Sequence, residues 1–279
     1  MTFENESSVS SRGLPLLRDL IHEETGIEFG DDMLDVLFDK IVPLAADRGF
    51  DALIDYYYLL KYDRDAASEW PRLFDALSVR ETFFWREVDQ IQVLAASLLP
   101  GELEKRPFET VRIWSAACAT GEEPLSIAMA LNEAGLFHRA NIEIYASDAS
   151  PQAIAIASNG LYRERSFRNL PASLREKYFT AEDGNRWRIR PYLQDRVRWN
   201  SANLMSNAGI TPFAASRFVF CRNVFIYFST RSVRRVVDLL ADKMPHPGYL
   251  FLGAAESLLR INSKFNLQEI GGSFVYVRD

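Results

Sequence analysis

Two acidic residues, Glu122 and Glu123, follow a turn that resembles the glycine-rich turn of a nucleotide-binding domain. The turn, CATGEEPLS at 118–126, contains one glycine where such turns usually contain three. A pyrophosphate beside two carboxylates would meet like charge, at a cost on the order of 1 kcal/mol or more for each partly buried acid. A cationic nucleoside would be attracted, and the helix N-terminus could still bind its carboxylate. The turn therefore favours the sulfonium S-adenosylmethionine over a dinucleotide.

Further polar residues follow later apolar runs. Asp148 ends IEIYASD, at the position where doubly wound folds place an acid that accepts hydrogen bonds from ribose hydroxyls. Arg222, Asn223 and Tyr227 occur together in FCRNVFIYF. Because the carboxyl ends of parallel strands meet at one edge of a sheet, we expect these side chains and Glu122 or Glu123 to converge on one crevice.

The elements that position these residues alternate between strand and helix. VRIWSAA, IEIYASD, RFVFCRN and GYLFLGA are short apolar runs with helical patterns between them, which predicts an α/β fold with a doubly wound, Rossmann-like sheet. Thr120 is expected to cap the helix after the first strand, with Pro124 in its first turn. The alternation over 187–200 predicts a small antiparallel excursion, and the ending FNLQEIGGSFVYVRD predicts an antiparallel pair that closes a sheet edge.

The residues before this sheet predict a small all-helical domain at 14–78, because apolar residues recur three and four apart. Asp31 or Asp32 is expected to cap its second helix, and Gly49 to end it. We expect a linker and active-site approach segment at 79–110 and a cofactor-binding domain at 111–279, with a small β subdomain at 179–200. The serine-rich residues 1–13 predict a mobile tail.

Composition excludes several functional classes. The chain has 279 residues, 48% of them hydrophobic, and a formal net charge of −6, so no global basic field favours nucleic acid. The sequence predicts neither a signal peptide nor a membrane-spanning segment. It has 2 cysteines without a CxxC pair and 3 scattered histidines, which supports neither a disulfide framework nor a metal site. We expect a cytoplasmic protein.

Five motifs occur in an order that resembles the CheR-type chemotaxis receptor methyltransferases. They are ETFFWRE (81–87), VRIWSAACATGEEPLSIAMAL, IYASDASPQAIAIASNGLY, NLM and FVFCRNVFIYF. The resemblance extends from about residue 15 to the C-terminus. It implies a protein-glutamate O-methyltransferase that forms methyl esters on the cytoplasmic helices of a chemoreceptor-like signalling protein. The cofactor would be S-adenosylmethionine and the product S-adenosylhomocysteine.

The resemblance also assigns roles to residues at matching positions. Arg86 would lie at the reaction centre as a carboxylate clamp, and Tyr227 would orient the incoming carboxylate. The residues expected to bind the cofactor are Thr82, Ala117, Gly121, Glu123, Asp148, Asn203, Leu204, Arg222 and Asn223.

Two departures from the family leave alternatives open. Arg80 stands where the family usually has asparagine. The second predicted helix carries Asp31, Asp32, Asp35, Asp39 and Asp47 against Lys40 and Arg48, where receptor-docking relatives have an arginine-rich helix. An acidic face should repel an acidic helix bundle. Either the substrate surface differs or docking uses another face, such as the basic residues Arg163, Arg165 and Arg168, which could equally be a solvated face. The rival functions are a cofactor-binding regulatory module without transfer activity, and transfer to a small molecule.

Overall fold

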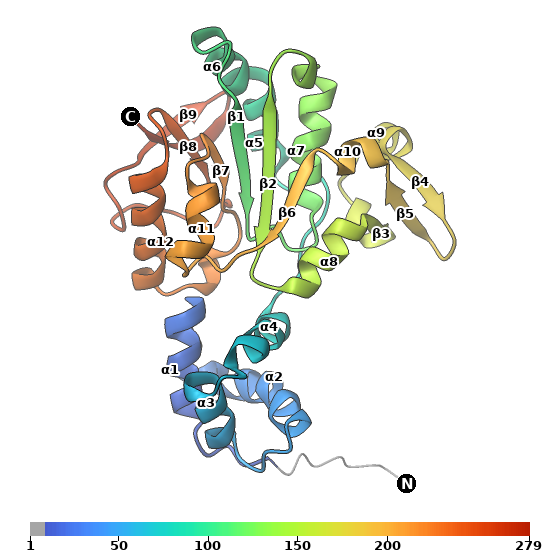
Figure 1. Ribbon diagram of the computed structural model, residues 1–279. Coiled ribbons are helices and arrows are strands. Elements are labelled where there is room, and N and C mark those ends of the chain that lie inside the picture. The colour runs from blue at the N-terminus through green and yellow to red at the C-terminus, as the bar shows by residue number, and fades with distance from the viewer. Residues whose placement is uncertain (1–8) are drawn as a thin grey trace.

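A computed structural model describes residues 9–279, in which a helical domain adjoins one end of a central sheet (Figure 1). The predicted tail at 1–13 lies mostly outside the described residues. Its described part is packed, since Val9 is 5% exposed and Ser10 forms a β-bridge with Ala52. The prediction of a mobile tail is therefore wrong for residues 9–13.

The helical domain contains one short 3-10 helix and four α-helices. They are α1 (Leu14–Thr25), η1 (Asp31–Met33), α2 (Leu34–Asp47), α3 (Leu53–Tyr62) and α4 (Ala66–Leu77). Their apolar faces form one buried cluster. The predicted Asp31 or Asp32 cap is wrong, because these residues form η1 and α2 begins after Met33 without a side-chain cap. Asp31 instead pairs with Arg18.

A helical linker connects this domain to the sheet and covers part of one sheet face. It comprises α5 (Val88–Val93), the π-helical turn η2 (Leu94–Leu98) and α6 (Leu99–Lys105). Together with α7 (Glu122–Glu133), these helices pack on the face that includes Ile113 of β1. The neighbouring residue, Trp114, belongs to the cluster formed with α11 (Asn207–Ala214) and α12 (Thr230–Lys243) on the other face. This alternation along a strand is the signature of a sheet covered on both sides.

The central sheet has seven strands in the order β6-β2-β1-β7-β8-β10-β9. The strands are β1 (Val111–Ala116), β2 (Ile142–Asp148), β6 (Val197–Ser201), β7 (Phe218–Phe220), β8 (Gly248–Phe251), β9 (Asn266–Ile270) and β10 (Ser273–Arg278). All pairs are parallel except those of β10 with β8 and β9. The doubly wound α/β fold and the antiparallel C-terminal pair are confirmed.

A second, three-stranded antiparallel sheet lies beside α8 (Pro151–Asn159) and is built from β3 (Leu161–Arg163), β4 (Phe179–Glu182) and β5 (Arg186–Ile189). The sequence placed the whole of 187–200 in this excursion, which is wrong for its second half. A short helix, α10 (Pro191–Gln194), ends the small sheet, and residues 197–201 then pair with β2 in parallel. The remaining elements are η3 (Leu136–His138), η4 (Glu164–Phe167), α9 (Ala172–Tyr178) and η5 (Phe225–Tyr227).

Candidate active site

Two adjoining cavities lie where the helical domain meets the carboxyl ends of β1, β2 and β7. The approach-segment cavity, about 50 Å³, is lined by residues of the 79–91 segment together with Glu123 and Arg222. The interdomain cavity, about 300 Å³, is lined by both domains. The two share Val79, Ala117, Ala119 and Asn223 in their walls. The interdomain cavity alone is of the size that a nucleoside-sized ligand needs.

The predicted catalytic and cofactor-binding residues distribute between these cavities, with one exception. Thr82, Arg86, Glu123 and Arg222 line the approach-segment cavity, Asp148, Asn203, Leu204 and Tyr227 line the interdomain cavity, and Ala117 and Asn223 line both. Gly121 lines neither.

Gly121 contributes through the turn and its packing. Its φ is 95°, and a Cβ there would lie 2.8 Å from the ring of Trp199 and 2.9 Å from the side chain of Ala157. No bulkier residue would fit this turn, because both the backbone conformation and the space favour glycine. The predicted cofactor contact of Gly121 thus gains no support.

The backbone is strained around the cavities. Of the 7 residues other than glycine with positive φ among residues 9–279, the 5 found here are Trp85, Glu87, Ala117, Ala119 and Asn223. Such conformations cost on the order of 1–3 kcal/mol each and persist where surrounding contacts enforce them. Their concentration around the two cavities supports this region as the candidate functional site.

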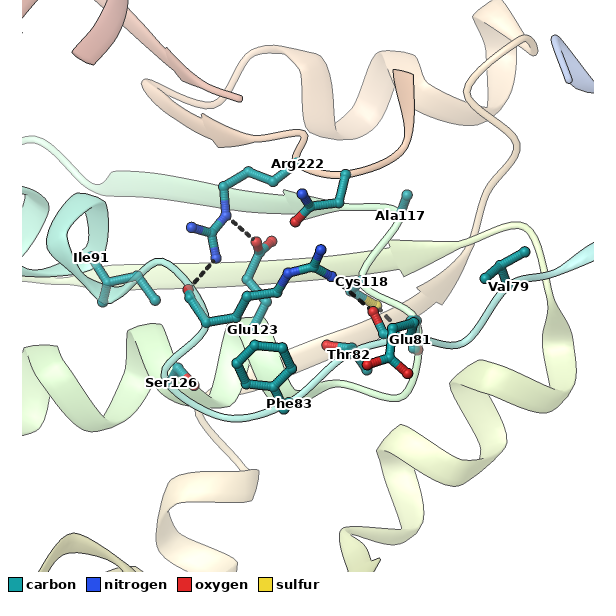
Figure 2. Close-up of a pocket in the computed structure, with 13 residues that line it drawn as sticks. Val79, Glu81, Thr82, Phe83, Ile91, Ala117, Cys118, Glu123, Ser126 and Arg222 are labelled. Carbon is teal, nitrogen blue, oxygen red and sulfur yellow. Dashed lines mark hydrogen bonds and ion pairs between the residues drawn. The ribbon is translucent and has the colours of Figure 1, made fainter. Parts of the chain in front are cut away.

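Arg222 and Glu123 form the buried centre of the approach-segment cavity (Figure 2). Arg222 Nε donates to Glu123 Oε2 at 2.6 Å, and Glu123 Oε1 accepts from Ser115 Oγ at 2.6 Å. The Arg222 guanidinium also donates to the backbone carbonyls of Arg86 at 3.0 Å and Glu87 at 3.1 Å. Arg222 therefore fixes the approach segment onto the sheet, and Glu123 carries a charge that is already paired.

The other acid of the turn, Glu122, does not face the cavities. It is 2% exposed and accepts hydrogen bonds from Ser166 Oγ and Thr120 Oγ1. Burial raises the pKa of its carboxyl, and these two hydroxyls oppose the shift. Thr120 is thus engaged with Glu122 and does not cap α7, whose N-cap is Gly121 without a side-chain bond. The expected capping role of Thr120 is wrong, and of the two acids only Glu123 lines a cavity.

Asp148 lies at the end of β2 and faces the interdomain cavity. Its Oδ2 accepts from the Ala119 amide at 2.9 Å and its Oδ1 from the Ser150 amide at 2.9 Å. Burial raises the pKa of Asp148, and the two amides oppose the shift. Each oxygen keeps lone-pair capacity for another donor, which suits the hydroxyls of a ribose.

We expect Asp148→Asn to weaken S-adenosylhomocysteine binding at pH 7 at least tenfold, or about 1.4 kcal/mol, because one acceptor oxygen is lost. Affinity of the unmodified protein should fall as pH drops through the raised pKa of Asp148, and the variant should lack this dependence. Because the pKa of Asp148 is raised in the folded state, protonation of Asp148 stabilises the fold at low pH, and this contribution is lost as the pH rises. Protonation of Asp148 therefore does not itself unfold the protein. Calorimetric titration at several pH values measures it, and equal affinities at pH 7 would contradict the assignment.

Asn203 and Leu204 connect the two domains beside this cavity. Asn203 Nδ2 donates to the Glu24 carbonyl of α1 at 2.7 Å, and Asn203 Oδ1 accepts from the Met205 amide at 2.9 Å. Leu204 is 7% exposed and supplies apolar lining. The polar atoms of the Asn203 side chain are thus engaged within the protein, so Asn203 shapes the cavity wall.

Arg86 and Tyr227 lie in adjoining cavities. Arg86 Nη1 donates to the Glu81 carbonyl at 2.8 Å, and its guanidinium lies 5.6 Å from the centre of the Phe83 ring. Tyr227 is 38% exposed, and its carbonyl accepts from the Glu28 amide at 2.9 Å. Neither side chain is buried, although Arg86 Nε also lies 3.8 Å from Glu87 Oε1, so an incoming carboxylate would compete with Glu87 for this guanidinium.

Sequence reasoning missed two glutamates that hold the site together. Glu256 Oε1 accepts from the amides of Val224, Phe225 and Ile226, and its Oε2 from those of Asn223 and Gly253, at 2.7–3.3 Å. Its position just after the apolar run GYLFLGA, at a strand end, was the available signal.

The second is Glu87, whose Oε1 accepts from Asn223 Nδ2 and whose Oε2 accepts from the Ala254 amide. It lies in the approach segment but outside the part that carries a role by resemblance. Glu87 and Glu256 together fix Asn223 from two sides.

The basic residues after β3 lie outside both cavities. Arg163 and Arg165 are exposed and line an open groove together with Arg186 and the acids Glu164 and Asp183. Arg168 pairs with Glu81, and its guanidinium lies 3.7 Å from the Phe83 ring centre. Arg168 therefore stabilises the approach segment.

Both cysteines are buried, as expected for small apolar residues, and burial raises the pKa of each thiol. Across residues 9–279, no group of three or more His, Cys, Asp or Glu side chains is arranged to hold a metal ion. In the same range no helix is both long and apolar enough to cross a membrane.

Residues 80–272 match the family model described as the CheR methyltransferase SAM binding domain, and residues 12–78 match that of its all-alpha domain. Chemotaxis protein methyltransferase 2 of Vibrio cholerae is 30% identical over 98% of this chain and 95% of its own. Chemotaxis protein methyltransferase 1 of Pseudomonas aeruginosa is 28% identical over 96% of this chain and 98% of its own. The probable biofilm formation methyltransferase WspC of Pseudomonas putida is 34% identical over 81% of this chain and 52% of its own.

Proposed function

The chain belongs to the CheR methyltransferase family, and we propose that it methylates glutamate side chains of a chemoreceptor-like signalling protein. Its methyl donor is S-adenosylmethionine. The observation that carries the proposal is that Arg86 and Tyr227 line two adjoining cavities that share Ala117, Ala119 and Asn223 in their walls, between a helical domain and the strand ends. The helical domain beside the cavities provides additional surface that a macromolecular acceptor would contact and a small molecule would not need.

The lining of the cavities fits this cofactor. Asp148 in the interdomain cavity offers acceptor oxygens for ribose hydroxyls, and Leu204 with the apolar side chains around it offers a surface for adenine. Glu123 and Asn223 lie at the approach-segment end, where polar groups would meet the amino-acid part of the cofactor. The paired charge of Glu123 leaves Asp148 as the anionic group that disfavours a pyrophosphate.

The reaction requires little acid or base catalysis from the protein. When bound, S-adenosylmethionine supplies a methyl group on a sulfonium, and a glutamate carboxylate is already ionised at neutral pH. Arg86 would bind the acceptor carboxylate through its planar guanidinium, and the Tyr227 hydroxyl would donate a hydrogen bond that orients it. The approach segment, fixed by Arg222, would keep water out. Positioning of this kind contributes up to about 7–11 kcal/mol in the best cases.

We expect Arg86→Ala to lower kcat/KM for a receptor fragment about 100-fold, and Tyr227→Phe about tenfold, with affinity for S-adenosylhomocysteine unchanged. Each substitution removes a contact to the acceptor while leaving the buried Arg222 and Glu123 in place. The assay follows transfer of a labelled methyl group from the cofactor to the cytoplasmic fragment of a chemoreceptor. Transfer at the unmodified rate in both variants would contradict these roles.

Arg163 and Arg165 remain candidates for docking a partner, because both are exposed at the groove beside the small sheet. Acidic residues share the groove, so a partner bound there would need mixed charge. Arg80, one of the two departures that raised the alternative of a module without transfer, lies outside both cavities and donates to Gln152 Oε1 at 2.7 Å. Its charge also acts to lower the pKa of Asp148. The methyl-transfer assay decides between the enzyme and this alternative.

A further inference from the structure

The mouth of the interdomain cavity has an exposed apolar rim contributed by both domains. We define this apolar rim as Met33 and Val36, at the start of the α2 region, with Ile226 and Tyr227 of η5. Their exposed fractions are 41%, 45%, 49% and 38%, and all four line the cavity. Exposed large apolar side chains gathered at a cleft are typical of a contact surface for another macromolecule.

Carboxylates flank this rim on its helical side. Asp32, Asp35 and Asp39 are exposed and follow one another three and four residues apart, in the row next to Met33 and Val36. Lys40 also lines the cavity, but its ammonium donates to the Ala76 carbonyl at 2.9 Å and is partly buried. A segment that lies across the rim therefore meets apolar side chains with a row of negative charge beside them.

The charge of the whole helical domain reinforces this local field. Residues 14–77 contain 15 Asp and Glu against 6 Lys and Arg, a net charge of −9, whereas the complete chain carries −6. The remainder of the chain is therefore net positive by 3 charges, and the negative charge of the protein is concentrated on the domain that bounds the cleft. Such a field attracts basic partners and repels acidic ones over about a Debye length.

We propose that the segment presenting the acceptor glutamate is a helix whose flanking residues are basic and apolar. This inference rests on the proposed methyl transfer and specifies its substrate. Lysine or arginine three and four residues from the acceptor would pair with Asp35 and Asp39, and apolar residues between them would cover Met33, Val36 and Ile226. The rim leads directly into the cavity that contains Asp148 and Tyr227, so a segment bound there has its acceptor at the site.

Two helical peptides of equal length test this proposal, each with one central glutamate and the same apolar residues. One carries lysine three and four residues on either side of the glutamate, and the other carries aspartate there. We expect the lysine peptide to bind the protein saturated with S-adenosylhomocysteine at least tenfold more tightly at low salt, and the difference to shrink as salt is added. Fluorescence anisotropy measures both affinities.

Charge-reversal variants test whether Asp35 and Asp39 cause the preference for the lysine peptide. The double variant Asp35→Lys/Asp39→Lys should lose at least tenfold in affinity for the lysine peptide. The matched control Asp51→Lys/Asp55→Lys makes the same change of net charge around α3, whose residues line neither cavity, and should lose much less. Thermal unfolding and S-adenosylhomocysteine binding check that both variants are folded.

The possible results distinguish a failure of the proposed docking surface from a failure of the proposed methyl transfer. Equal or tighter binding of the aspartate peptide, or an equal loss in the control variant, would overturn the proposal. Methyl transfer to the bound peptides is measured separately. Transfer that favours the aspartate peptide would contradict basic flanks while supporting glutamate methylation. Tight binding of the lysine peptide without any transfer would support the docking surface and count against the proposed reaction.

Discussion

Replacement of Arg222 by methionine is expected to destabilise the fold by about 3–5 kcal/mol and to abolish methyl transfer, because it leaves a buried carboxylate without its partner. The Arg222 side chain is 1% exposed and that of Glu123 is 14% exposed. The substitution also removes the donors that hold the carbonyls of Arg86 and Glu87. The approach segment would then lose its attachment to the sheet.

A second substitution distinguishes stability from function. The double variant Arg222→Met/Glu123→Leu removes both charges, and replacing a buried ion pair by apolar residues is often nearly neutral for stability. We expect it to recover most of the lost unfolding free energy but not the transfer activity, since the approach segment stays unattached. Urea unfolding and the methyl-transfer assay measure the two properties. A stable Arg222→Met protein with full activity would contradict the positioning role of Arg222.

Substitution of Glu256 by glutamine is expected to have the next largest effect. Oε1 of Glu256 accepts three amides and Oε2 accepts two. Glutamine keeps one acceptor oxygen, so at least two amides lose their partner, at about 1–3 kcal/mol each. The loss of unfolding free energy should therefore be about 2–6 kcal/mol.

The same substitution should weaken S-adenosylhomocysteine binding at least tenfold, because Asn223 lines both cavities and its loop is held by Glu256. The matched control is Glu269→Gln, at an exposed position of the edge strand β9. Calorimetric titration and urea unfolding of both variants measure the difference. Glu256→Gln behaving like Glu269→Gln would show that the five amides do not depend on the carboxylate charge.

The sequence predicted the architecture well because periodicity reports burial. Short apolar runs separated by helical patterns indicate a sheet covered on both faces, and the structure confirms it. The same reasoning misplaced residues 197–200, since a strand at the edge of a parallel sheet is half covered and alternates like an antiparallel one. Strand pairing depends on partners that are distant in the chain, which local alternation does not identify.

The sequence predicted which elements form the site better than it predicted what each side chain does there. Strand ends located Asp148 and the 222–227 segment, because parallel strands bring their carboxyl ends together. The residue pattern alone left Glu122 and Glu123 as alternatives, and only the family resemblance selected Glu123. Adjacent helical residues point about 100° apart, so the tertiary fold decides which one meets Arg222. Arg222 and Gly121 act through packing and hydrogen bonds within the protein, so a motif that marks them as important does not specify how they act. Glu256 lies in none of the five motifs, and only the fold shows that it binds backbone amides.

The most direct test of the account is the chemical identity of the methylated group. The protein, a chemoreceptor cytoplasmic fragment and S-adenosylmethionine are incubated, and the fragment is analysed by peptide mass spectrometry before and after mild base. We expect methyl groups on glutamate side chains. Mild base should remove them with release of methanol, because methyl esters are hydrolysed in base. Absence of methylation, or base-stable methyl groups on lysine, arginine or hydroxyl side chains, would contradict it.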